Sequence, residues 1–265
     1  MLIVSLLILN SGCITVECEP TEAADTEDSS IPTPSQDWGS GTENESTTPE
    51  ETEEEEEEEP STESEPTPEP TPEPVDYLFN DDASLLYVQV WKDEDAWGSG
   101  FAHNHVMRSS NWEGVVTYME DDLSSCNFDF VVPVNDLIVD EDVMREYVGY
   151  SDTINQSDRA EIRSHMLDSN QLDAENHPYI SFVSASCSLD SSAKLRVTGD
   201  FTLVGTTREV DLVMDFMIDG NMFYARGRFD FNHSDFNLTP YSALNGFIRN
   251  DEPLNIHFDM VGSAL

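Results

Sequence analysis

Alternation of apolar and polar residues dominates the chain after residue 83 and predicts β-strands. The clearest stretch is 196–204, where Val197, Gly199, Phe201 and Leu203 share one face and polar residues share the other. Period-two alternation with one apolar face is typical of a half-buried antiparallel strand. Similar strands are expected at residues 84–91, 111–119, 126–132, 180–187, 210–218, 222–231 and 255–261. The pattern therefore predicts an all-β domain of about eight antiparallel strands.

Turn and helix signals separate these strands. Asn176-His177-Pro178 predicts a turn before the strand at 180–187, because the residue before a proline is pushed out of helical geometry. Asp190-Ser191-Ser192 and Asp219-Gly220-Asn221 have the composition of hairpin turns. Only residues 134–170 have helical character, and apolar spacing over 159–167 predicts a helix capped by Ser157 or Asp158. Closure of the strands into an up-and-down barrel with this short helical insertion would remove exposed sheet edges.

The inward-facing side chains are the candidate ligand site. Phenylalanine and methionine offer apolar area with little polarity, which suits a flexible apolar ligand. An eight-stranded barrel has room either for its own side chains or for one small ligand, and alternation alone favours a filled core. The inward-facing candidates are Phe128, Phe130, Phe201, Leu203, Met214, Phe216, Phe229, Phe231, Phe258 and Met260.

His103 and His105 are the most prominent polar pair. Alternate residues of an extended segment face the same way, so both imidazoles could bind one metal ion, but no third ligand is evident nearby. A contact with a ligand head group is a second interpretation, and a structural hydrogen-bonding role is favoured over both. No nucleophile elbow or phosphate-binding glycine loop occurs, so no catalytic residue, cofactor or metal is assigned. An enzyme with these histidines at the barrel mouth remains a rival hypothesis.

Cys126 and Cys187 are candidates for a disulfide. If strands 126–132 and 180–187 pair antiparallel, Cys126 can lie opposite Cys187, and Phe130 would face Val183. Two cysteines in an exported protein are expected to bridge. The alternative is a pair of separate buried thiols.

The first 13 residues have the character of an export signal. Residues 1–9 are apolar apart from Ser5, but they are too few to span a bilayer, which takes about 20 residues. Such a run is typical of the apolar region of a secretory signal. Ser11-Gly12-Cys13 then resembles the lipobox of bacterial lipoproteins, in which the cysteine is lipidated, although Asn10 stands where leucine is usual and no positive charge precedes the run. Plain secretion and a chance apolar start are the alternatives.

Residues 14–76 are rich in Glu, Thr, Ser and Pro and are expected to form a disordered spacer, because apolar residues, whose burial could offset the entropy cost of ordering, are nearly absent. An acidic tail that collects calcium or binds a partner is the alternative. Of the 55 acidic residues, 23 precede residue 77, which leaves 32 against all 11 Lys and Arg and a net charge of −21 for residues 77–265. Such acidity repels nucleic acid, which excludes that class of partner.

The stretch LDAENHPYISFVSAS (172–186), followed by VTGDFTLVGTTREVDL (197–212), resembles the YceI-like family of bacterial polyisoprenoid-binding proteins. In that family an acidic residue and a Tyr- or His-Pro pair precede an I-x-F strand, and a G-x-L/F-T-L-x-G-x-T-R/K hairpin follows. The resemblance extends more weakly from about Tyr77 to the end of the chain, and the segment around His103 and His105 is similar to one branch of the family. It implies an extended lipocalin-like barrel with a long internal apolar cavity.

These inferences define three segments and a function. Residues 1–13 are expected to be the signal and lipobox, 14–76 the acidic linker and 77–265 a lipid-binding barrel. The resemblance implies a non-catalytic exported protein of the bacterial cell envelope that carries an apolar chain, either a polyisoprenoid or a fatty-acid-like chain, and meets the membrane only through its lipid anchor. A filled barrel that docks another envelope protein is the alternative, and no oligomeric state is assigned.

Overall fold

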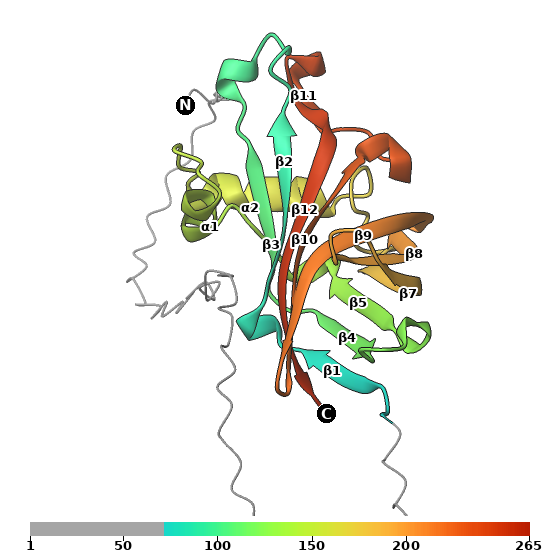
Figure 1. Cartoon of the computed structure of the whole chain (residues 1–265). Coiled ribbons are helices and arrows are strands. Elements are labelled where there is room, and N and C mark those ends of the chain that lie inside the picture. The colour runs from blue at the N-terminus through green and yellow to red at the C-terminus, as the bar shows by residue number, and fades with distance from the viewer. Residues whose placement is uncertain (1–71) are drawn as a thin grey trace, which may run out of the picture.

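The computed structural model describes residues 72–265, which form a closed eight-stranded antiparallel barrel with few helices (Figure 1). The all-β barrel predicted from the alternation is confirmed. The strands are β1 Val75–Phe79, β2 Leu85–Lys92, β3 His105–Ser109, β4 Glu113–Tyr118, β5 Asn127–Pro133, β6 Leu137–Val139, β7 Tyr179–Leu189, β8 Leu195–Leu203, β9 Thr206–Asp219, β10 Met222–Asn232, β11 Ser242–Ala243 and β12 Ile248–Ala264. The α-helices are α1 Asp142–Tyr147 and α2 Gln156–Leu167, and short 3-10 helices include η3 Leu123–Ser125, η5 His233–Phe236 and η6 Leu244–Gly246.

Strand β12 belongs to both the barrel and a lateral extension of its sheet. The barrel follows the order β4-β5-β7-β8-β9-β10-β12, and β1 closes it by pairing with β4 and with the last residues of β12. The earlier part of β12 pairs instead with β2, from Leu254 opposite Val90 to Asp259 opposite Leu85. Strands β3 and β6 continue from β2, so β2, β3 and β6 form a wing on the barrel.

One end of the barrel is filled by aromatic rings. This aromatic plug consists of Tyr77, Phe79, Tyr118, Phe128, Phe216 and Phe223. The ring centroids of Phe79 and Phe128 lie 5.3 Å apart, and those of Tyr118 and Phe216 lie 5.4 Å apart. Gly114 lies against the plug at a position with no room for a side chain. A Cβ there would come within 2.8 Å of the Phe79 ring. Two of the plug residues, Tyr77 and Phe79, belong to β1, which lies at the lower end of the barrel in Figure 1.

The short strands and the helix start differ from the sequence predictions. Strands β1, β3, β6 and β11 span five residues or fewer, too few for a clear alternation, and were not expected. Helix α2 is capped by Asn155, whose side chain accepts a hydrogen bond from the Asp158 amide at 3.0 Å. The predicted caps, Ser157 and Asp158, are wrong because both residues lie within the first helical turn.

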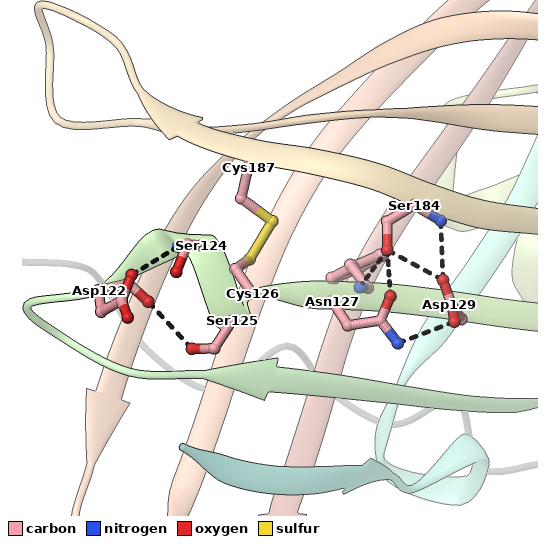
Figure 2. The surroundings of a disulfide bond; sticks show 9 residues. Asp122, Ser124, Ser125, Cys126, Asn127, Asp129, Ser184 and Cys187 are labelled. Carbon is pink, nitrogen blue, oxygen red and sulfur yellow. Dashed lines mark hydrogen bonds between the residues drawn. A yellow bond between two sulfur atoms is a disulfide. The ribbon is translucent and has the colours of Figure 1, made fainter. Parts of the chain in front are cut away.

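The pairing of β5 with β7 is shifted by one residue from the predicted register. Phe130 lies opposite Phe182, not opposite Val183. The observed register keeps both phenylalanines on the inner face, whereas Val183 points outward and is exposed. A disulfide joins Cys126, just before β5, to Cys187 on β7, with the Cα atoms 5.9 Å apart (Figure 2).

Polar side chains continue this link between β5 and β7. The Ser184 amide donates a hydrogen bond to Asp129 at 2.7 Å, and the Ser184 hydroxyl accepts one from the Phe128 amide at 2.8 Å (Figure 2). The disulfide and this cluster therefore reinforce the pairing of two strands that are separated along the chain by residues 134–178, which include β6, α1 and α2. Within residues 72–265, no helix has the length and apolar character needed to cross a membrane.

Candidate ligand cavity and its polar rim

A cavity of about 440 Å³ opens in the half of the barrel away from the aromatic plug. Its walls come from the wing and β12 on one side, from β5, β7 and β8 on another, and from α2, which crosses the barrel at mid-height in Figure 1. Ligand cavities are usually about 300–1,000 Å³ and mostly apolar. The barrel is therefore neither solid nor fully hollow: one half is filled by its own rings, and the other has room for a ligand.

The structure places four of the ten predicted inward-facing residues in the cavity wall, and these are Phe130, Phe201, Leu203 and Phe231. The other six do not line it. Phe128 and Phe216 belong to the aromatic plug, Phe229 stacks on Phe231, and Met214, Phe258 and Met260 are buried elsewhere in the core. All ten side chains belong to or pack against the core, but alternation carries no information on depth along the barrel.

Helix α2 and the wing supply lining residues that the sequence analysis did not include. Ile162 and Met166 stand one helical turn apart on α2 and cover the cavity. Their spacing was visible as part of the predicted helix, but the face of the barrel that the helix would cover was not. On the wing, Met107 on β3 and Leu86 and Val90 on β2 complete the apolar wall.

A row of four side chains, three of them polar, runs along β3 into the cavity. His105, Met107 and Ser109 occupy alternate positions of the strand and line the cavity, as does His103 just before the strand. Burial increases along the row: the side chain of His103 is 44% exposed and that of His105 13%, whereas Ser109 is buried. The row therefore leads from the rim of the cavity to its interior.

His105 is held by a fully buried carboxylate. Its Nδ1 atom lies 2.6 Å from Oδ2 of Asp140, a residue with 0% exposure. The other oxygen of Asp140 accepts hydrogen bonds from the Arg145 guanidinium at 2.7 Å and from the Val106 amide at 3.0 Å. Three donors, one each from His105, Arg145 and the Val106 amide, therefore surround this carboxylate.

Arg145 joins this carboxylate to a second one. The guanidinium is 2% exposed and donates to Oδ1 of Asp152 at 2.6 Å and to the backbone carbonyl of Asn104 at 2.8 Å. The second oxygen of Asp152 bonds Nδ1 of His103. Burial alone would raise the pKa of Asp152, but the hydrogen bond from His103 and the charge of Arg145 outweigh it, so this pKa lies below its ordinary value.

The two histidines of the predicted pair therefore end one continuous network: His103, Asp152, Arg145, Asp140 and His105. Sequence reasoning found the two ends and missed the three central residues. Its only available signal was the scarcity of basic residues, since Arg145 is one of 11 in the whole chain. Among residues 72–265, no three His, Cys, Asp or Glu side chains are grouped to hold a metal ion.

The architecture is that of a lipocalin-like binding protein: a closed antiparallel barrel with an apolar cavity reached from one end. A model of the YceI-like domain matches residues 92–260, and the chain belongs to the YceI-like family. The resemblance noted at residues 172–212 is thus confirmed. The YceI-like fold is a binding-protein fold, consistent with a hydrophobic ligand.

A solved structure supports this fold. The crystal structure of BcnA from Burkholderia cenocepacia is similar with a TM-score of 0.52 at 15% sequence identity, covering 69% of this chain and 98% of BcnA. A YceI protein from Campylobacter jejuni matches with a TM-score of 0.40 at 15% identity, over 58% of this chain and 82% of that protein. No curated protein sequence matches the chain.

Proposed function

We propose that this protein is an exported, non-catalytic carrier that holds one apolar chain, a polyisoprenoid or a fatty chain, in the barrel cavity. The observation that carries the proposal is the cavity of about 440 Å³ between α2, the wing and the β5–β8 wall. Its interior is lined by side chains such as Met107, Phe130 and Leu203, which offer only apolar contact. Each methylene moved from water into such a site contributes about 0.8 kcal/mol, so affinity grows with chain length and no bond is made or broken.

The proposal of a non-catalytic role rests on how the histidines are used. Both Nδ1 atoms are engaged by carboxylates, and within residues 72–265 no serine or cysteine bonds either ring as a nucleophile would. Ser109 Oγ lines the cavity but has no partner among these residues. An activated nucleophile needs a base within hydrogen-bonding reach, and the carrier function does not.

Export and lipid anchoring are proposed from residues 1–13, which lie outside the described residues, as does the acidic linker up to residue 71. The Cys126–Cys187 disulfide supports an oxidising compartment, where such bonds persist. YceI-like proteins are typically periplasmic, which agrees with a place in the bacterial cell envelope. Lipidation at Cys13 would make the anchor the only membrane contact.

Native mass spectrometry of protein purified from its own host, followed by organic extraction, tests the carrier proposal. The expected result is a co-purifying apolar species that is lost in Leu203→Trp or Ile162→Trp, which place an indole in the cavity from opposite walls. Val183→Trp is the matched control, because it adds the same ring to the outer face of β7. Ligand-free wild-type protein that also fails to take up added long-chain alkane would overturn the proposal and favour the docking alternative.

A further inference from the structure

The buried network fixes the tautomers of His103 and His105. Asp140 and Asp152 each accept a hydrogen bond from the Arg145 guanidinium, and a carboxylate in such an ion pair is an acceptor only. The proton between each carboxylate and its histidine then belongs to Nδ1, and in a neutral imidazole the other nitrogen is left as an acceptor. Within residues 72–265, no protein group bonds Nε2 of either ring.

Charge at this end of the cavity disfavours an anion. The residues that line the cavity include Asp158 and Glu161 of α2 and no Lys or Arg. Arg145 already faces two carboxylates, and Arg159, which reaches the Asp140 carbonyl at 3.4 Å, is paired with Asp142. A carboxylate or phosphate brought to this rim would meet unbalanced negative charge, in a domain whose net charge from residue 77 onward is −21.

We infer that the carried molecule has an uncharged head group that donates a hydrogen bond, the hydroxyl of a long-chain alcohol, and that Nε2 of His105 accepts this bond. The inference rests on the proposed carrier function and deepens it by naming the head. His105 is the acceptor because it is the more buried ring and is held by the fully buried Asp140. The hydroxyl sits at the rim, and the chain extends past Met107 toward Ser109 and the interior.

The test compares three probes of one chain length: hexadecanol, hexadecanoic acid and hexadecane. Each competes with a bound fluorescent naphthylamine at about pH 8, where free imidazole is largely uncharged and a carboxylic acid is ionised. Wild-type protein is expected to bind the alcohol roughly 3- to 10-fold more tightly than the alkane, the gain of one hydrogen bond. The acid is expected to bind more weakly than the alcohol by about tenfold or more, because its charge loses water without finding a partner.

The decisive variant is His105→Asn, whose side-chain amide can still donate to Asp140 but places no acceptor where Nε2 was. It is expected to remove the preference for the alcohol over the alkane, measured as the ratio of the two affinities in the same variant. His103→Asn, on the more exposed ring, is expected to reduce the preference less. His165→Asn is the matched control, because His165 also lines the cavity but stands outside the network, and it should keep the full preference.

The outcomes separate this inference from the carrier function. If none of the three probes binds, the carrier function fails, and this inference fails with it. If all three bind equally, or if the acid binds most tightly, the cavity carries a chain but the assignment of the head group is wrong. An alcohol preference that survives in both His105→Asn and His103→Asn also overturns it.

Discussion

The Oδ1 atom of Asp140, a residue without exposed surface, lies 2.7 Å from Nη1 of Arg145, which is buried almost as fully. Asp140 adopts a φ of 52°, in the left-handed region that costs a residue with a side chain roughly 1–2 kcal/mol. The contacts of its carboxylate with Arg145, His105 and the Val106 amide offset this cost. Such strain concentrates where a protein holds functional groups in place, and here those groups are the two rim histidines.

Asp140→Ala should destabilise the protein strongly. It leaves the Arg145 guanidinium buried beside one carboxylate instead of two, and breaking a buried ion pair in this way costs about 3–5 kcal/mol. The free energy of unfolding in urea, followed by tryptophan fluorescence, measures the loss. Asp142→Ala is the control, because its ion pair with Arg159 is long and exposed, and it should change stability by less than about 1 kcal/mol. Equal effects of the two variants would contradict a structural role for the buried pair.

Removal of the disulfide should destabilise the barrel without opening the cavity. The Cys126–Cys187 bond closes a loop of 61 residues, and cross-links of this kind contribute about 2–4 kcal/mol, chiefly by restricting the unfolded chain. Cys126→Ser combined with Cys187→Ser should therefore lower the urea midpoint. Thiol titration of the denatured, unreduced protein provides an independent check, since two free thiols beyond Cys13 and Cys18 would show that the bond is absent.

Phe128→Ala should lower the free energy of unfolding without lowering the affinity for a ligand. Phe128 is fully buried in the aromatic plug and does not line the cavity, so its truncation leaves a void in the packed half of the barrel. The expected loss of unfolding free energy is about 3–5 kcal/mol. Under conditions where the variant is still folded, its affinity for a long-chain alkane should match that of the wild-type protein. A large loss of affinity in folded protein would mean that the plug forms part of the ligand site.

His257→Phe should remove part of the pH dependence of stability. The wild-type His257 ring stacks on Tyr87 with the ring centroids 4.8 Å apart, and its Nε2 is buried without a partner among residues 72–265. Burial, helped by the charge of Arg228 and opposed by Asp230, lowers the pKa of His257. The unfolded chain therefore takes up the proton more readily, and the stability contributed by the neutral ring is lost as the pH falls below about 6.5.

Urea unfolding of both proteins between about pH 7.5 and pH 5.5 measures this effect. The wild-type protein should lose more unfolding free energy over this range than His257→Phe does. Parallel curves for the two proteins would show that His257 does not contribute to the dependence.

The alternation of residues predicted the barrel because a strand exposes one face to the core and the other to water, and this leaves a period of two in the sequence. It could not predict which half of the barrel would be filled. Phe128 and Phe130 are two positions apart on one face of β5, yet one belongs to the plug and the other to the cavity wall. Their difference in depth is set by β1 and α2, which approach from distant parts of the chain.

The rim network was hidden for a different reason. In a chain with 55 acidic residues, Asp140 and Asp152 have nothing in their immediate sequence to distinguish them. Their importance comes from the fold, which brings α1 and the loop after it against the segment before β3 and so places Arg145 between them. The His-x-His spacing revealed the ends of the network because both rings project from a single extended segment.

The position of strand β1 bears on how the proposed lipid anchor would orient the barrel. The strand begins at Val75 and lies at the lower end of the barrel in Figure 1, where it supplies Tyr77 and Phe79 to the aromatic plug. His103 and His105 line the cavity, which lies in the other half of the barrel. The chain that precedes β1 therefore joins the barrel at the end filled by the aromatic plug. If the protein is a lipid-anchored carrier as proposed above, its cavity would open away from the end of the barrel at which the anchor segment joins.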